Sequence, residues 1–184
     1  MGSIHFTLHL DRKHADRVGE IAASIAKLAR DLGFAEVDNP RHLVGAACNV
    51  DDTPEPGLAW VLIQAQRQVD NQVLVPEEIH VVRTVPGAGC EPANIGLSRY
   101  VDTPDWTWTG QCKTRHAAEP GVGGVENYVR CHVALCSLLA KLQDLGVTVD
   151  VRDEVGYWTD RDAAALAERV TAERNQQAPF AAAK

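Results

Sequence analysis

Residues 106–151 read WTWTGQCKTRHAAEPGVGGVENYVRCHVALCSLLAKLQDLGVTVDV, and this stretch decides the fold class. Alternation over Trp106–His116 predicts a strand whose polar face carries Thr107, Thr109, Gln111, Lys113 and Arg115. The glycine cluster Gly121–Gly124 predicts a turn. Apolar residues at helical spacing over Val125–Leu145 predict a helix, after which Val147–Val151 is again strand-like. This order of strand, helix and strand is a β-α-β unit, which indicates an α/β protein.

The N-terminal residues repeat this order. Ile4–Leu10 alternates apolar and polar residues and is predicted to be a half-buried strand. Asp11–Leu32 carries one apolar stripe and precedes Gly33, as a helix would. We expect an α+β two-layer sandwich with a split β-α-β, ferredoxin-like core, whose two or three helices pack on one face. The sheet is predicted to be mixed and largely antiparallel, with about six strands.

The middle of the chain is predicted to insert a meander of strands into this core. Asp51–Gly57 reads as a turn, and Leu58–Val69 as a strand because apolar and polar residues alternate, although a helix also fits that stretch. Glu78–Val85 is rich in β-branched residues and is also strand-like. Pro86–Asp105 is rich in Gly and Pro and is expected to form a long loop of the kind that covers binding sites.

The chain is expected to form a single domain over residues 1–175, with a frayed tail over 176–184. Thr159 and Asp162 form a variant capping box that opens a last helix, which we expect to extend to about Arg174.

Composition and charge exclude several classes of protein. Hydrophobic residues make up 45% and charged residues 23%, as in a folded globule. Neither a signal peptide nor a run of about 18 apolar residues is present, so we expect a cytoplasmic protein without a membrane span. The five cysteines lack a C-x-x-C pair, which indicates reduced thiols. A net charge of -7 argues against a sequence-independent nucleic-acid binder.

The first candidate site surrounds the glycine turn and comprises Lys113, Arg115, His116, Gly123, Gly124, Asn127 and Arg130. A helix N-terminus offers unpaired N–H groups and the positive end of a dipole, and so favours an anion. The two cations and the Gly123 and Gly124 amides would hold that anion, Asn127 and Arg130 would orient it, and His116 is the best general acid–base candidate. Neither a P-loop nor a dinucleotide-binding pattern is present, and an ordinary turn before a helix has the same sequence features.

The second candidate site is the polar face of the sheet, to which two strands contribute His5, Thr7, His9, Gln64, Gln66 and Gln68. His5 and His9 lie about 13 Å apart along an extended strand, so one metal ion cannot bind both. The alternatives are a solvated face or a homodimer formed through it.

The third candidate is Cys131, His132 and Cys136, because His132 and Cys136 lie four apart, share a helix face and could bind a metal. That face coincides with the apolar stripe of the helix, which favours a buried core position for them instead. Cys112 with His116, or Cys90, could supply a nucleophile. Asp150, Asp153 and Glu154 near a strand end could bind Mg²⁺ or act as a base, or simply solvate a turn.

These patterns favour an intracellular domain that binds a small anionic ligand between the polar sheet face and residues 113–130, and whether it is an enzyme stays open. One alternative is a non-catalytic interaction protein, such as an adaptor, an immunity-type inhibitor or a structural subunit, with Trp60, Trp106 and Trp108 at its interface. Another is a transition-metal protein. No motif names a cofactor.

Overall fold

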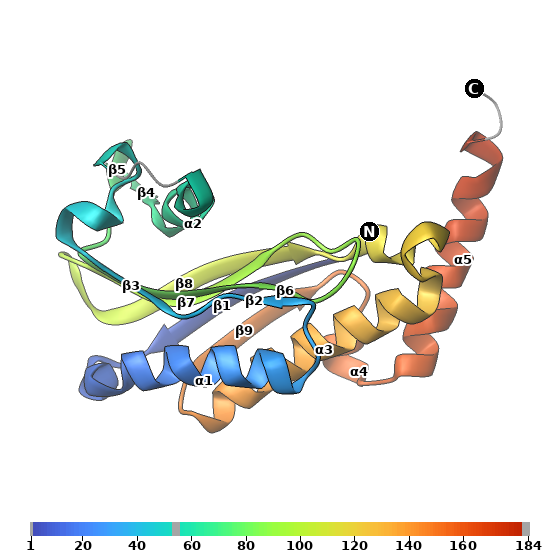
Figure 1. Ribbon diagram of the computed structural model, residues 1–184, viewed down its shortest axis with the longest axis horizontal. Coiled ribbons are helices and arrows are strands. Elements are labelled where there is room, and N and C mark those ends of the chain that lie inside the picture. The colour runs from blue at the N-terminus through green and yellow to red at the C-terminus, as the bar shows by residue number, and fades with distance from the viewer. Residues whose placement is uncertain (1, 53–55, 182–184) are drawn as a thin grey trace.

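The computed structural model describes residues 2–52 and 56–181, without the side chains of residues 56 and 177–181. The strands are β1 Ser3–Leu10, β2 Glu36–Val37, β3 Arg41–Val44, β4 Arg67–Val69, β5 Gln72–Leu74, β6 Glu78–Val85, β7 Ala93–Tyr100, β8 Thr103–Lys113 and β9 Thr148–Asp153. The helices are α1 Val18–Asp31, α2 Pro56–Ala65, α3 Gly124–Asp144, α4 Tyr157–Asp160 and α5 Ala163–Ala181. The sheet forms a central layer, with α1 and α3 on one face and α2 with the β4–β5 hairpin on the other (Figure 1).

The main sheet has the strand order β2-β6-β7-β8-β1-β9, and β3 also pairs with β6. The four strands β9, β1, β8 and β7, with α1 after β1 and α3 between β8 and β9, form the expected ferredoxin-like core. Every strand pairing among the described residues is antiparallel, so the expectation of a mixed sheet is wrong. The sheet has seven strands because the insertion between α1 and β7 adds β2, β3 and β6 at one edge.

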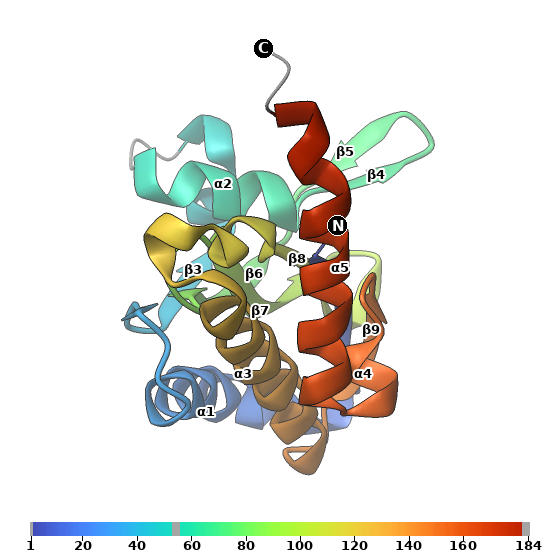
Figure 2. The ribbon, with the colours of Figure 1, turned by 90° about the vertical axis from the view of Figure 1, so that its right-hand side faces the viewer.

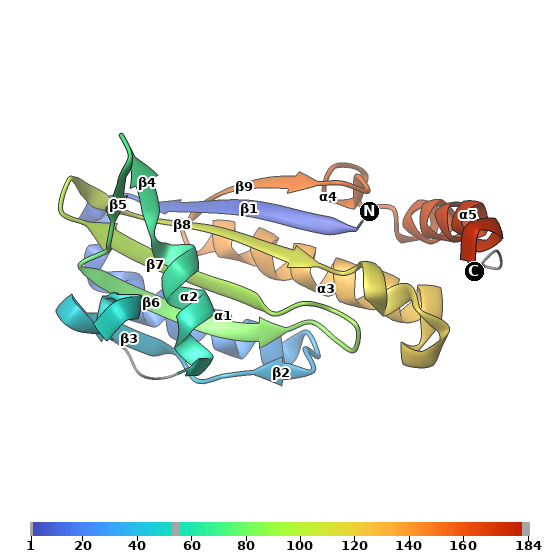
Figure 3. The same ribbon diagram turned by 90° about the horizontal axis from the view of Figure 1, so that it is seen from above.

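The helices α1 and α3 lie on one face of the sheet, as the two β-α-β units predict (Figures 1 and 3). Their buried side chains recur at helical spacing: Val18, Ile21, Ile25 and Ala29 on α1, and Tyr128, Leu135, Leu139 and Leu142 on α3. These stripes pack on the apolar face of β1, where Ile4, Phe6, Leu8 and Leu10 are buried. Burial of this apolar surface is the main force that holds the two layers together.

The prediction of a strand over Leu58–Val69 is wrong. Most of this segment forms the helix α2, and the short strand β4 follows it. Leu58, Val61, Leu62 and Ala65 are buried, and their spacing is helical as well as partly alternating. Pro56 begins the helix, where its missing N–H costs no hydrogen bond. The sequence of this segment fits the strand period of 2 and the helix period of 3.6 nearly equally, and packing against the sheet favours the helix. Residues 53–55 of the predicted turn before it lie outside the described residues.

Pro86–Asp105 is not a long loop either, because β7 occupies its centre. Seven of the eight β7 residues are buried, so the strand lacks the alternation that marks a half-exposed strand. Gly96 in β7 is required by close packing, since a Cβ atom there would lie 2.5 Å from the His80 carbonyl oxygen. The glycine that suggested a loop instead permits the close approach of β6 and β7.

The C-terminal residues form two helices. Thr159 lies in α4, and Asp162 alone caps α5, where its Oδ1 accepts hydrogen bonds from the backbone N–H groups of Ala164 and Ala165. The helix continues past Arg174 to Ala181, so most of the expected frayed tail is helical, and residues 182–184 lie outside the described residues (Figure 2). Among the described helices, none has both the length and the apolar character of a membrane span.

Candidate functional site

A groove of about 840 Å³ opens on the sheet face opposite α1 and α3, beneath α2, and we call it the α2 groove. Its walls comprise His5, Gly57, Trp60, Val61, Ile63, Gln64, Gln66, Arg83, Glu91, Pro92, Asn94, Thr109, Gly110, Gln111 and Lys113. Most of the polar side chains in this set are uncharged amides, hydroxyls or imidazole. Its volume falls within the ~300–1,000 Å³ of typical small-molecule sites.

The floor of the α2 groove follows from the period of two along each strand. Gln111 on β8 pairs with His5 on β1, and Arg83 on β6 pairs with Asn94 on β7, so these four side chains share the face opposite the core helices. The roof follows from the period of 3.6, which places Gly57, Trp60, Val61 and Gln64 on one side of α2. The groove therefore forms where a helix crosses a polar sheet face.

Three hydrogen bonds fasten α2 to the sheet. The Tyr100 hydroxyl donates to the Ala65 carbonyl oxygen at 2.5 Å, and Gln64 Nε2 donates to the Thr109 carbonyl oxygen at 2.8 Å. Gln64 Oε1 then accepts from Asn94 Nδ2 at 3.1 Å. Because the Thr109 carbonyl can only accept, this chain fixes the orientation of both side-chain amides.

That orientation leaves Asn94 Oδ1 buried without a hydrogen-bond partner. An unpaired buried acceptor costs about 1–3 kcal/mol. The wall of the groove therefore contains one buried acceptor without a hydrogen bond.

The cations that line the groove are paired with carboxylates. Lys113 Nζ lies 3.3 Å from Glu91 Oε1, and Arg83 Nη1 lies 2.9 Å from Glu36 Oε2. Both pairs are partly exposed, and such pairs contribute little stability, so each cation can exchange its partner for a ligand anion at small cost. Trp60 differs from these residues because 76% of its surface is exposed at the rim of the groove.

The structure brings together residues from two of the predicted candidate sites. Lys113 of the glycine-turn segment lies in the α2 groove with His5, Gln64 and Gln66 of the polar face. Gln64 and Gln66 reach it from α2 and from the residue that precedes β4, not from the predicted strand. Thr7, His9 and Gln68 are not among the lining residues, and His9 instead contacts Asp105 at 3.2 Å.

The rest of the glycine-turn segment lies apart from the groove. His116 Nδ1 contacts Glu119 Oε1 at 2.8 Å, and Arg115 Nε donates to the other ring nitrogen of His116. The Gly124 N–H donates to the Glu119 carbonyl oxygen at 2.9 Å, and the Gly123 N–H to the Pro120 carbonyl oxygen at 3.4 Å. Both amides that were predicted to hold an anion are thus used within the turn.

Asn127 and Arg130 lie together on the first turns of α3, and both bind loop carbonyl groups. Asn127 Nδ2 donates to Ala88 O and Ala117 O, whereas Arg130 Nη1 donates to Pro86 O. They therefore fix residues 86–90 against α3. Anion binding by this pair stays a prediction.

The cysteines of this region form a contact group rather than a catalytic dyad with His116. Cys112 Sγ donates to the Glu91 carbonyl oxygen at 3.2 Å. A hydrogen bond from Cys90 and the neighbouring Arg130 lower the pKa of Cys131, and the same contact raises the pKa of Cys90. Cys131 is fully buried, so its lowered pKa does not make it an accessible nucleophile.

His132 and Cys136 share a helix face as predicted, and Asp153 from β9 completes a buried group with them. His132 Nε2 lies 3.1 Å from Asp153 Oδ1, and its Nδ1 lies 3.1 Å from Thr114 Oγ1. Both ring nitrogens are thus engaged, and both His132 and Asp153 are almost inaccessible. Hydrogen bonding inside the core explains this group without a metal ion.

The three tryptophans considered for an interaction surface do not form a patch. Trp106 and Trp108 are 3% and 2% exposed and pack in the core, whereas Trp60 stands on α2. The same helix covers part of the sheet face through which a homodimer was expected, and dimerisation stays a prediction.

Sequence reasoning missed Trp60, Arg83, Asn94 and Gln111 as groove residues. Gln111 and Arg83 lie on strands that were predicted correctly, whereas Trp60 and Asn94 lie in the two misassigned segments. The helical spacing of residues 58, 61, 62 and 65 was the signal that could have placed Trp60.

Comparisons with known proteins give no name to this site. No protein-family model, no curated protein and no solved structure matches this chain.

Proposed function

We propose that this protein binds a small molecule in the α2 groove, and that the molecule combines a flat polar ring with one anionic group. The observation that supports this most directly is the lining of the groove, where amides, hydroxyls and His5 surround a space of ligand size beside an exposed tryptophan. A few placed polar groups in a concave site are typical of small-molecule binding.

Each part of the proposed ligand corresponds to a residue type. An aromatic ring is the partner that an exposed Trp60 side chain stacks on most favourably, and a ring with polar edges can use the amides of Gln66 and Gln111. Lys113 is partly exposed, and a phosphate or carboxylate could replace its contact with Glu91. The described residues that line the groove include no nucleophile paired with a base, so the proposal concerns binding alone.

Titration calorimetry with nucleoside 5′-monophosphates and the matching nucleosides tests this proposal, because these probes carry the same ring with and without the anion. We expect at least one monophosphate to bind, and to bind more tightly than its nucleoside. Replacing Lys113 by Met removes a charge-assisted hydrogen bond worth about 1.5–3 kcal/mol, which corresponds to a loss of affinity of roughly tenfold to 150-fold.

Two matched variants make the result specific. Lys141→Met removes an exposed lysine from α3, outside the groove, and should leave binding unchanged. Trp60→Ala should weaken the nucleoside and the monophosphate by similar factors, whereas Lys113→Met should weaken only the monophosphate. Absence of binding by every probe at millimolar concentration, or equal affinity for parent, Lys113→Met and Trp60→Ala, would overturn the proposal.

A further inference from the structure

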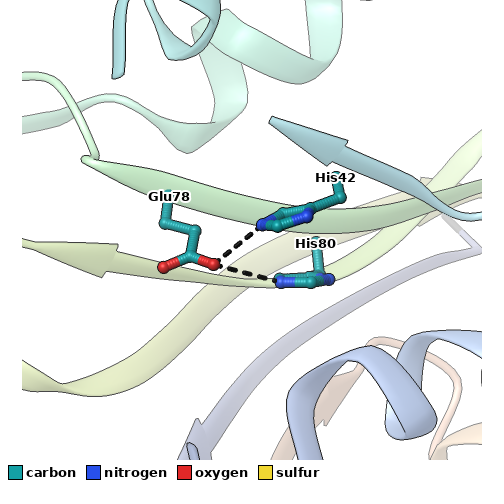
Figure 4. Close-up of side chains that lie close together, drawn as sticks. All are labelled: His42, Glu78 and His80. Atoms are coloured by element: carbon teal, nitrogen blue, oxygen red, sulfur yellow. Dashed lines mark hydrogen bonds and ion pairs between the residues drawn. The ribbon is translucent and has the colours of Figure 1, made fainter. Parts of the chain in front are cut away.

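A second group of side chains with ligand chemistry lies on the other face of β6, away from the α2 groove. It consists of His42 on β3 with Glu78 and His80 on β6, and we call it the histidine–glutamate cluster (Figure 4). The β3–β6 pairing places His42 opposite His80, and the period of two places Glu78 on the same face as His80. The cluster therefore exists only because two strands far apart in the sequence pair in this register.

The donor atoms of the cluster converge on one point. His42 Nε2 lies 2.8 Å from Glu78 Oε1, and His80 Nε2 lies 3.4 Å from the same oxygen. One ligand atom from each residue lies within 4.8 Å of the others. Two ligands bound to one ion at about 2.0–2.2 Å are themselves roughly 3–3.5 Å apart, so the three ligand atoms already lie near the required spacing. Binding would turn the two stacked rings so that both Nε2 atoms point at the ion.

We propose that the histidine–glutamate cluster binds a divalent transition-metal ion, with Zn²⁺ as the closest fit. Two imidazoles and one carboxylate are a ligand set that suits Zn²⁺ and its first-row neighbours, whereas Mg²⁺ and Ca²⁺ prefer oxygen ligands throughout. Three protein ligands leave at least one coordination position for water or another small molecule. The site goes beyond the proposed ligand groove and does not depend on it.

The surroundings of the cluster hold its members in place. Arg99 Nη2 lies 3.4 Å from Glu78 Oε2, while its Nη1 lies 2.6 Å from Glu77 Oε2. This contact engages the oxygen of Glu78 that faces away from the histidines and leaves Oε1 directed at them. The Trp106 ring meets His80 edge-on at 5.6 Å. Outer contacts that orient a carboxylate and an imidazole in this way are common features of metal sites.

The cluster is also open to solvent, unlike the buried His132, Cys136 and Asp153 group. About half of the His42 side chain is exposed, whereas His132 is inaccessible and has both ring nitrogens hydrogen-bonded inside the core. An ion can therefore reach the cluster from water. The two rings stack at 4.0 Å, and the Nε2 atom of each lies near the same Glu78 oxygen.

Zinc titration of the full chain, after treatment with a chelator, tests the proposal. We expect calorimetry to show about one equivalent of Zn²⁺ bound in the micromolar range or tighter, and Co²⁺ to bind competitively with a visible absorption band. His42→Ala and Glu78→Gln should each weaken Zn²⁺ binding at least tenfold, since each removes one of three ligands. His42→Ala is the substitution less expected to disturb folding, because His42 is exposed on an edge strand. Circular dichroism verifies that each variant is folded.

The chain offers a matched control in His9, whose Nε2 lies 3.2 Å from Asp105 Oδ2 in a partly exposed pair without a second histidine. His9→Ala should bind Zn²⁺ as the parent does. If the parent binds no Zn²⁺ at 100 µM, roughly the upper limit for a specific three-ligand site, the proposal is wrong. It is equally wrong if folded His42→Ala and Glu78→Gln retain the affinity of the parent.

Discussion

Replacing Asp153 by Asn should strongly destabilise the protein, because this carboxylate links β9 to the core. Its Oδ1 accepts hydrogen bonds from His132 Nε2 at 3.1 Å and from the Val155 N–H at 3.0 Å. Its Oδ2 accepts from the Trp158 N–H at 2.8 Å. An asparagine amide cannot accept all three, since its Nδ2 is a donor.

The hydrogen bonds around His132 connect Asp153 to the rest of the core. Thr114 Oγ1 donates to the Gly2 carbonyl oxygen at 2.9 Å and lies 3.1 Å from His132 Nδ1. The other ring nitrogen, Nε2, lies 3.1 Å from Asp153 Oδ1. Thr114, His132 and Asp153 therefore form a buried hydrogen-bonded chain that links the end of β8, the helix α3 and the strand β9.

Losing one buried hydrogen bond to a charged carboxylate costs about 1.5–3 kcal/mol. With a urea dependence of about 2 kcal/mol per molar, Asp153→Asn should lower the denaturation midpoint by roughly 1 M. Asp150→Asn, an exposed position on the same strand, should change stability by less than about 0.5 kcal/mol. A loss below about 1 kcal/mol for Asp153→Asn would refute the role of these hydrogen bonds.

The stability lost in the Asp153→Asn variant should depend on pH. Burial alone would raise the pKa of Asp153, but the hydrogen bond and charge of His132 and the bonds from backbone N–H groups outweigh it and lower the pKa below its usual value. A lowered pKa in the folded state means that the carboxylate stabilises the protein above its unfolded-state pKa and loses this effect as the pH falls through the folded-state pKa. The stability difference between parent and Asp153→Asn should thus be constant near neutral pH and shrink in acid below pH 3.8.

Two further substitutions test the packing on the two faces of the sheet. Gly110→Ala should lower the free energy of unfolding by about 1–3 kcal/mol in thermal or urea denaturation, because the added Cβ would lie 2.2 Å from Phe6 Cζ. Gly121→Ala is the control, since its Cβ would meet no atom within 4 Å, and its stability should stay close to that of the parent. Tyr100→Phe removes the hydrogen bond to the Ala65 carbonyl oxygen and should lower the free energy of unfolding by about 1 kcal/mol. Amide hydrogen exchange should become faster mainly in α2. Unchanged exchange in α2 would show that this bond does not fasten the helix.

Much of the fold could be predicted because most segments of the two β-α-β units follow one clear hydrophobic period. The alternation of Ile4–Leu10 and the stripes of α1 and α3 each have one period and one buried face. Such segments specify their own secondary structure, and their order restricts the possible topologies. The two segments predicted wrongly, residues 58–69 and 86–105, are those whose period is ambiguous or absent.

The candidate sites were less predictable, because they depend on pairing between distant residues. His5 and Lys113 could be placed on polar strand faces, but their meeting with Trp60 required the position of α2. His42 and His80 both lie in the insertion between α1 and β7, separated by the segment that contains α2 and the β4–β5 hairpin, and no spacing rule connects them. Only the pairing of β3 with β6 brings them together.

The strand, turn and helix of residues 106–151 show which features the local sequence determines and which depend on tertiary structure. Their sequence alone determined the strand β8, the helix α3 and the sheet face on which Lys113 lies, because these features depend on local period. Tertiary structure decided what the polar groups do: it engaged the Gly123 and Gly124 amides within the turn and left Lys113 beneath α2. A hydrogen-bonding side chain takes whichever partner the fold brings within about 3 Å, and that partner can come from any distance along the chain.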